Sequence, residues 1–383
     1  MDPLTHTMAG AGLSGAGLRR ATPLATATLI LAANAPDIDS ITRIAGTYPH
    51  LALHRGVTHG IPGLLLLPFA ILGLILLWDR HVRLRRHPEA APVRPGPTLA
   101  LGYVGVTSHL FLDWLNTYGI RWLVPLDGRW FHADAVFIID PWIWLILATP
   151  LVLAHSSRRW AQVAWGVLGA AATGLVLAVD VVPNAARVAW LAGLATLVAL
   201  RLRAPEPPGE RRAERRFRGA LLLFAAYVTV MIVSTRAAAD EVRTALAERG
   251  IREVQDVMAA PNPANPFERT VVARAPGVYH MGEHSWLRRP RVEIGVDSIP
   301  NPEPTPTERA ALETPNARHF LAWSRFPFRR IEERDDGYTV YIVDARYIDR
   351  GGRGALAGVV VRLNEALEPM PADGNGMAQG EGR

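Results

Sequence analysis

The chain has 383 residues, 49% of which are hydrophobic, so it is long enough for two structural units and apolar enough for a membrane protein. Its 41 Lys and Arg residues modestly exceed its 35 Asp and Glu residues, and the arginines gather between apolar runs. That distribution indicates membrane topology and argues against the basic surface of a nucleic-acid-binding protein. Because the chain contains no cysteine, disulfides and thiolate metal sites are excluded, and any metal must bind to His, Asp or Glu.

Eight apolar runs in the first 235 residues predict membrane-spanning helices. The first two runs are short, and we expect them either to span the membrane or to form a re-entrant or interfacial pair. The eight runs lie at about 4–18, 21–35, 61–78, 98–115, 137–154, 160–180, 186–202 and 217–234.

The positively charged loops fall after every second apolar run, as alternation across a membrane requires: at Arg19-Arg20, 79–94, 155–159 and 201–218. The positive-inside rule places these loops in the cytoplasm. Segment 34–60, the loop at 116–136 and everything after about 235 are then predicted to lie on the outer side of the membrane.

From about residue 236 the composition changes, and stretches such as "PRVEIGVDSI" and "FRRIEERDDGYTVYIVDARYID" are typical of β-strands joined by turns, with DDG marking a hairpin. Helices are expected at about 236–250 and 306–322. The sequence thus predicts an all-α polytopic membrane domain of about eight helices followed by a small soluble α+β domain. The predicted boundaries are 1–155 for a membrane domain with the candidate site, 156–235 for additional transmembrane helices, 236–367 for the extracytoplasmic α+β domain and 368–383 for a disordered tail.

Metal-binding residue types gather at the predicted outer ends of the apolar runs. His109 and Asp113 are four residues apart, so they share one face of a helix. Asp113 also lies near a helix C-terminus and close to hydrocarbon, two costs that a bound cation would offset. The candidate ligands are His6, Asp37, Asp39, His54, His59, His109 and Asp113.

Each candidate has a structural alternative when taken singly. A lone histidine can be a buried residue bonded to a carbonyl, and Asp37 or Asp39 can form an Asx-turn or helix cap after Pro36. Arg55, beside His54, suits an anionic phosphoryl group, although a loop arginine is more often simply solvated. The gathering of seven candidates on one membrane face favours a shared metal site.

Five motifs follow one another in the order and spacing of the YdjM-like family, which this sequence resembles over about residues 1–155. They are "MDPLTHTMAGAGL", "NAPDIDS", "HRGVTHG", "SHLFLDWLNTYG" and "FIIDPW". The resemblance implies a bacterial inner-membrane protein of a group regarded as metal-dependent hydrolases.

A looser similarity links the pattern to zinc-dependent phospholipase C and to the zinc single-strand nucleases. It implies His6, Asp37 or Asp39, His54 or His59, His109 and Asp113 as ligands. The later H-x-x-x-E ligand pair of those enzymes has no counterpart in this sequence. One or two divalent ions are therefore expected, with zinc favoured and manganese as the alternative.

Together these features predict a metal-dependent hydrolase of a phosphoester or phospholipid at the outer face of the inner membrane, with catalytic roles for Asp39, Asp113 and Arg55. Two other classes stay open: an ion-coupled transporter or channel that uses the same His and Asp cluster, and a non-catalytic membrane scaffold. The expected partners are the lipid bilayer and a small-molecule or lipid substrate, with no nucleic acid. The sequence sets no oligomeric state.

Overall fold

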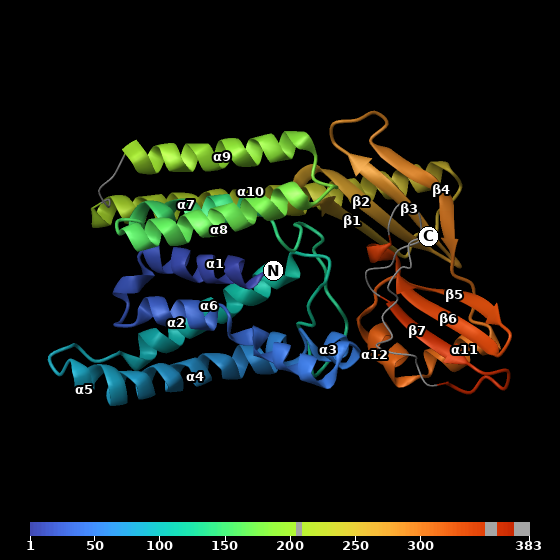
Figure 1. The fold of residues 1–383 in the computed structure, drawn as a ribbon, viewed down its shortest axis with the longest axis horizontal. Helices are drawn as coiled ribbons and strands as arrows, with labels where there is room; N and C mark the ends of the chain where they lie inside the picture. Colours follow the sequence, from blue (N-terminus) through green and yellow to red (C-terminus); the bar gives the residue numbers. More distant parts are fainter. Residues whose placement is uncertain (204–208, 349–357, 371–383) are drawn as a thin grey trace. The chain divides into compact units, whose positions relative to one another are not determined.

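The computed structural model describes residues 1–203, 209–348 and 358–370, and the chain forms two compact units (Figure 1). The first unit comprises Met1–Ile38, Arg55–Ala237 and Ala260–Arg269. The second comprises Asp39–His54, Ala238–Ala259 and Thr270–Arg383. The segment Asp39–His54, which the sequence places between two apolar runs, thus belongs to the unit that contains the C-terminal sheets.

The first unit is built from helices, and each of the eight apolar runs is helical. Proline occupies the first turn of α1, α4, α6 and α7, where its missing N–H has no helical partner to lose. The helices are α1 (Pro3–Gly15), α2 (Ala25–Ala32), α4 (Ile61–Trp78), α6 (Pro95–Trp114), α7 (Pro141–His155), α8 (Arg159–Ala178), α9 (Asn184–Arg203) and α10 (Glu210–Glu248), with a continuation of α4 through η4 (Asp79–Arg83) and α5 (Leu84–Arg86).

Within the described part of the chain, four helices are long and apolar enough to cross a membrane: Ile61–Arg86, Arg159–Ala178, Asn184–Arg203 and Glu210–Glu248. The predicted number of about eight spans is therefore not confirmed. The physical reason is clearest in α1 and α2, which have 13 and 8 residues. At about 1.5 Å per residue they are roughly 20 and 12 Å long, short of a hydrocarbon core of about 30 Å.

The two short helices pack closely against each other and against α6. A Cβ added at Gly10 would lie 2.8 Å from the Leu29 carbonyl oxygen, and one at Gly105 would lie 2.5 Å from the Ala32 Cβ. Only glycine fits at these two crossings, as is usual where helices approach closely in a membrane. This close packing brings the ends of α1, α2 and α6 together.

The C-terminal region contains two β-sheets and short helices, in agreement with the predicted change from helical to mixed structure. One sheet has the order β1-β2-β3-β4 and the other the antiparallel order β5-β6-β7. The elements are β1 (Asp256–Asn262), β2 (Asn265–Ala275), β3 (Val278–Ser285), β4 (Val292–Pro300), α11 (Pro306–Leu312), α12 (Pro315–Trp323), β5 (Pro327–Arg334), β6 (Gly337–Asp344), η5 (Ala345–Tyr347) and β7 (Gly358–Leu363).

The predicted DDG hairpin joins β5 to β6. Arg334 pairs with Gly337, so Asp335 and Asp336 form a two-residue turn. Gly337 has a φ of 136°, a backbone conformation that favours glycine. In the predicted tail, Pro369 forms an isolated bridge with Leu363, and residues 371–383 lie outside the described residues.

A segment from the N-terminal half is part of the second unit. Between the 3₁₀-helix η2 (Ala35–Ala45) and residue His54, helix α3 (Thr47–Leu53) packs against α12. The Tyr48 hydroxyl donates a hydrogen bond of 3.2 Å to the Gly358 carbonyl at the start of β7. The chain that connects the candidate ligands Asp37 and His59 is therefore held by the C-terminal unit.

Asp344 anchors the end of β6, and its replacement with alanine is expected to destabilise the second unit by about 3 kcal/mol, because it strands a buried charge. Its carboxylate is fully buried and accepts hydrogen bonds from the Ser324 hydroxyl at 2.6 Å, the Arg325 N–H at 2.9 Å and the Arg346 guanidinium at 2.9 Å. Thermal unfolding of the full-length protein, followed by near-UV circular dichroism, measures the loss. The matched control is Asp335→Ala in the exposed hairpin turn, which should leave the transition unchanged.

The same carboxylate predicts a pH dependence. Burial alone would raise the pKa of Asp344, but Arg346 and the Ser324 hydroxyl hold it below its usual value of 3.8. Because the folded-state pKa is depressed, the stabilisation is fully present above about pH 4 and is lost as the pH falls through the folded-state value. The unfolding temperature of the Asp344→Ala variant should therefore fall less steeply than that of the wild type as the pH is lowered. An equally steep fall in both proteins would contradict this assignment.

Candidate metal centre

Four predicted ligands come together at one end of the N-terminal helices. Asp37 follows α2, His59 ends the 3₁₀-helix η3 (Val57–His59) just before α4, and His109 and Asp113 lie in the last two turns of α6. One ligand atom from each of the four residues lies within 4.8 Å of the other three. All four residues belong to the first unit, so this geometry is internal to one compact body.

The distances among these atoms are close to those between ligands of a single metal ion. The Nε2 atom of His59 lies 3.1 Å from Nε2 of His109, and Asp113 Oδ2 lies 3.3 Å from the first and 3.5 Å from the second. Asp37 Oδ1 is 3.6 Å from both imidazoles. Ligands bound at about 2.0–2.1 Å around a tetrahedral ion stand roughly 3.3–3.4 Å from one another, so the two nitrogens and two oxygens could hold one metal ion.

The orientation of His109 is set by a backbone contact. Its Nδ1 atom lies 2.8 Å from the Ala33 carbonyl oxygen, and because a carbonyl can only accept, the neutral imidazole carries its proton on Nδ1. Its Nε2 atom therefore presents a lone pair to His59, Asp37 and Asp113. In His59, Nδ1 lies 3.0 Å from the Thr58 hydroxyl. Partners of this kind on the far ring nitrogen are usual in metal-binding histidines.

His6 adds a third imidazole beside the four-residue group. Its ring stacks on that of His109 with centroids 3.8 Å apart, and its Nε2 atom is 3.2 Å from Asp113 Oδ1. His6 is fully buried, and its Nδ1 atom makes no hydrogen bond within the described part of the chain, so Asp113 is the partner of its Nε2 atom alone. A buried imidazole in this state costs free energy unless a ligand satisfies it. Asp113 is thus shared, with one oxygen facing the four-ligand group and the other facing His6.

The negative charge of the centre comes from the carboxylates of Asp37 and Asp113, and neighbouring groups stabilise both. Burial alone would raise the pKa of Asp37, but its contacts with His59 and His109 lower the pKa below its usual value, so Asp37 is ionised at neutral pH. Asp113 lies near the C-terminus of α6, where the helix dipole disfavours a carboxylate. This unfavourable effect on the Asp113 carboxylate is offset by two positive groups. Arg55 Nε lies 2.9 Å from Asp113 Oδ2, and the buried α-amino group of Met1 contacts Asp113 Oδ1.

Arg55 is buried and serves the loop as well as Asp113. Its Nη1 donates to the Asp113 carbonyl at 3.2 Å, the Asn116 side-chain oxygen at 3.1 Å and the Gly119 carbonyl at 3.2 Å. The guanidinium lies over the Tyr118 ring. Arg55 itself has a φ of 55°, a strained conformation for a residue with a side chain, and such strain gathers at functional sites. These contacts make Arg55 a positioning residue for Asp113, while its predicted contact with substrate stays a prediction.

The remaining two predicted ligands lie in the second unit. Asp39 Oδ1 and His54 Nδ1 are 2.8 Å apart, and the His54 ring stacks on that of His50 with centroids 4.7 Å apart. The structure thus brings five of the seven candidates together within the first unit and pairs the other two with each other. The predicted roles of Asp39 as ligand and base stay predictions.

Three contacts in the centre lie beyond the predicted set. The Ala33 carbonyl, the Thr58 hydroxyl and the Met1 amino group all contact the ligands. Thr58 could have been found from its position next to His59, because metal-binding histidines need a partner on the second ring nitrogen. The carbonyl at Ala33 has no side-chain signal at all.

These helices and this His and Asp group define a helical membrane protein with a candidate metal centre at the ends of its N-terminal helices. The family described as YdjM inner membrane protein matches residues 1–186, which confirms the resemblance seen in the five motifs. The uncharacterized protein YfhP of Bacillus subtilis (strain 168) is 26% identical over 156 residues, which cover 38% of this chain and 43% of that protein. The match therefore spans less than half of the relative. No solved structure matches the chain.

Proposed function

We propose that this protein is a membrane-bound metal-dependent hydrolase that cleaves a phosphoester at the outer face of the inner membrane. The observation that supports the proposal most strongly is the spacing of the four ligand atoms in Asp37, His59, His109 and Asp113. The Nε2 atoms of the two histidines lie 3.1 Å from each other and 3.3 to 3.6 Å from the carboxylate oxygens. Nitrogen and carboxylate ligands at that spacing suit zinc, with manganese as the alternative.

A bound divalent ion would lower the pKa of a coordinated water and polarise a phosphoryl oxygen. The chain supplies the rest. His59 and His109 present their Nε2 lone pairs, and Asp37 and Asp113 supply negative charge. Arg55 holds the backbone and side chain of Asp113 in place. A carboxylate oxygen that does not bind the ion would accept the proton of the attacking water, and within the first unit Asp113 is the candidate for this role.

The test joins metal analysis to a substrate screen. The purified full-length protein should contain one or two zinc ions, and release of phosphate or of a phosphorylated headgroup should stop on chelation and return on zinc addition. Bound metal without turnover across phosphoester and phospholipid substrates would instead support the scaffold. Metal or proton flux into sealed vesicles, again without turnover, would support the transporter.

Arg55→Lys is expected to lower turnover by about tenfold or more, because mutation of groups that orient metal ligands typically costs 10–100-fold. Lysine keeps the charge but lacks the planar fork that bonds Asp113, Asn116 and Gly119 together. The matched control is Arg129→Lys, an exposed arginine paired with Asp127, which should retain full activity. Equal rates for the two variants would remove Arg55 from the proposed machinery.

A further inference from the structure

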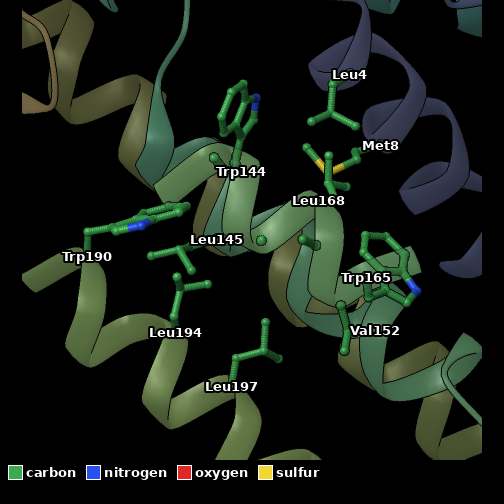
Figure 2. A pocket seen from close by; sticks show the side chains of 13 residues that line it. Leu4, Met8, Trp144, Leu145, Val152, Trp165, Leu168, Trp190, Leu194 and Leu197 are labelled. Carbon is green, nitrogen blue, oxygen red and sulfur yellow. The ribbon is translucent and has the colours of Figure 1, made fainter. Parts of the chain in front are cut away.

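A partly open groove lies among α1, α7, α8 and α9 of the first unit (Figure 2). All of its thirteen lining residues are apolar. On α7 the lining runs from Trp144 to Val152, about 12 Å along the helix axis at 1.5 Å per residue. The groove is therefore apolar and extends along α7.

Three tryptophans give the groove much of its surface, and two of them have their polar atom satisfied elsewhere. The Trp144 N–H donates to the Thr5 hydroxyl at 3.0 Å, and the Trp190 N–H donates to the Thr173 hydroxyl at 3.1 Å. Their rings consequently offer apolar faces to the space between the helices. Figure 2 shows these rings with Leu168 and Leu194 around the same space.

Helix α1 joins the groove to the metal centre. Leu4 and Met8, four residues apart, line the groove, whereas His6, between them in sequence, faces Asp113. The two sites thus lie on two faces of the first turns of one helix, whose diameter with side chains is about 10–12 Å. Trp144 ties the groove to the start of this helix, because its N–H also lies 3.3 Å from the Asp2 carboxylate that caps α1.

Exposed apolar side chains lie on two of the helices that line the groove. α8 and α9 are candidate spans, and their side chains Val163, Val167, Val188 and Leu191 are exposed. In a membrane such side chains contact acyl chains, so the groove is continuous with a lipid-facing surface. A charged or polar ligand would lose its hydration there without gaining a partner.

We propose that this groove binds one acyl chain of a bilayer phospholipid and thereby presents the headgroup to the metal centre across the first turn of α1. The inference rests on the proposed hydrolase function and narrows its substrate class from phosphoesters in general to phospholipids. An elongated apolar groove next to a hydrophilic metal centre matches the two parts of such a molecule.

The groove can be filled without disturbing its walls. A Cβ added at Gly169, which lines the groove on α8, would have no atom within 4 Å, so Gly169→Phe can begin its side chain there and is expected to reduce the space of the groove. Gly166 on the same helix is equally open, but it does not line the groove. Gly166→Phe is therefore a matched control for added bulk and for the loss of a helical glycine.

The experiment uses the full-length protein in phosphatidylglycerol vesicles that contain a phospholipid with a diazirine in the middle of one acyl chain. After illumination, mass spectrometry should find the label concentrated on groove residues of α7 and α8. Gly169→Phe should reduce that label severalfold, and Gly166→Phe should not. Labelling spread evenly over α8 and α9 and insensitive to Gly169→Phe would overturn the proposal, as would cross-linking of the groove to a second copy of the chain.

Two further measurements separate this proposal from the proposed function. Gly169→Phe should lower turnover of the phospholipid but leave bound zinc and turnover of p-nitrophenyl phosphate unchanged. Groove labelling that Gly169→Phe abolishes, in a protein without turnover of any phosphoester, would support the acyl-chain site and refute the hydrolase. Phospholipid turnover that Gly169→Phe does not alter would support the hydrolase and refute the role of the groove.

Discussion

His109→Ala should remove most of the zinc bound to the purified protein, and Asp113→Asn should do the same. His109 Nε2 lies within 3.6 Å of the other three candidate ligand atoms, and Asp113 Oδ2 lies within 3.5 Å of both imidazole nitrogens. Loss of either residue would leave three of the four candidate ligands, which should weaken zinc binding. Inductively coupled plasma mass spectrometry on detergent-purified protein measures the zinc-to-protein ratio directly.

The control for this experiment is His81→Ala. His81 follows the end of α4, whereas His59 precedes its start, and the 18 residues of α4 separate the two by about 27 Å at 1.5 Å per residue. Zinc content should be unchanged in this variant. Unaltered zinc in His109→Ala and Asp113→Asn, with normal gel-filtration profiles, would show that the buried cluster is a hydrogen-bonded core and not a metal centre.

The same assay assigns the residues of the second pair. Asp39→Ala and His54→Ala should lower the zinc content only if these side chains reach the ion, since in the structure they pair with each other at 2.8 Å. Full retention of zinc in both would limit the ligand set to the residues of the first unit.

Much of the fold follows from local sequence patterns. Each apolar run forms a helix, which satisfies the backbone N–H and C=O groups within the segment itself, and the DDG turn is where the pattern predicts it. The number of spans was harder to predict, because hydrophobicity alone does not fix where a helix starts and ends. The apolar run at 21–35 forms a helix only over Ala25–Ala32. Leu24 has a φ of 61°, which is not a helical conformation, so the helix begins after it.

The site could be predicted to a similar depth. The spacing of His109 and Asp113 indicates a shared helix face, and in the structure both side chains belong to the same four-residue group. The choice between Asp37 and Asp39, and between His54 and His59, could not be made from sequence. It depends on the packing of Asp39–His54 with the C-terminal unit, a long-range contact exemplified by Tyr48 and Gly358, for which residues 34–60 carry no local signal.

Reporter fusions at Arg86, Glu210 and Gly282 should read cytoplasmic, cytoplasmic and extracytoplasmic. The first two positions adjoin the arginine-rich ends of helices, at 80–86 and 211–218, and positive charge resists transfer across the inner membrane. The third lies in β3, after the apolar part of α10, a helix of 39 residues that is longer than a hydrocarbon core requires. Alkaline phosphatase, active only outside, and green fluorescent protein, fluorescent when fused inside, give opposite readings at each position.

This result decides which leaflet the metal centre can reach. His59 precedes α4 and Arg86 ends its continuation, so a cytoplasmic Arg86 puts the ligand end of that 26-residue span on the outer side. The acyl-chain groove beside α1 would then take its lipid from the outer leaflet. A cytoplasmic signal at Gly282 together with an outer signal at Arg86 would invert the whole arrangement, and the proposed substrate would have to be sought among inner-leaflet lipids or cytoplasmic phosphoesters. Mixed readings, with Gly282 and Arg86 on the same side, would instead mean that the number of spans between them is even.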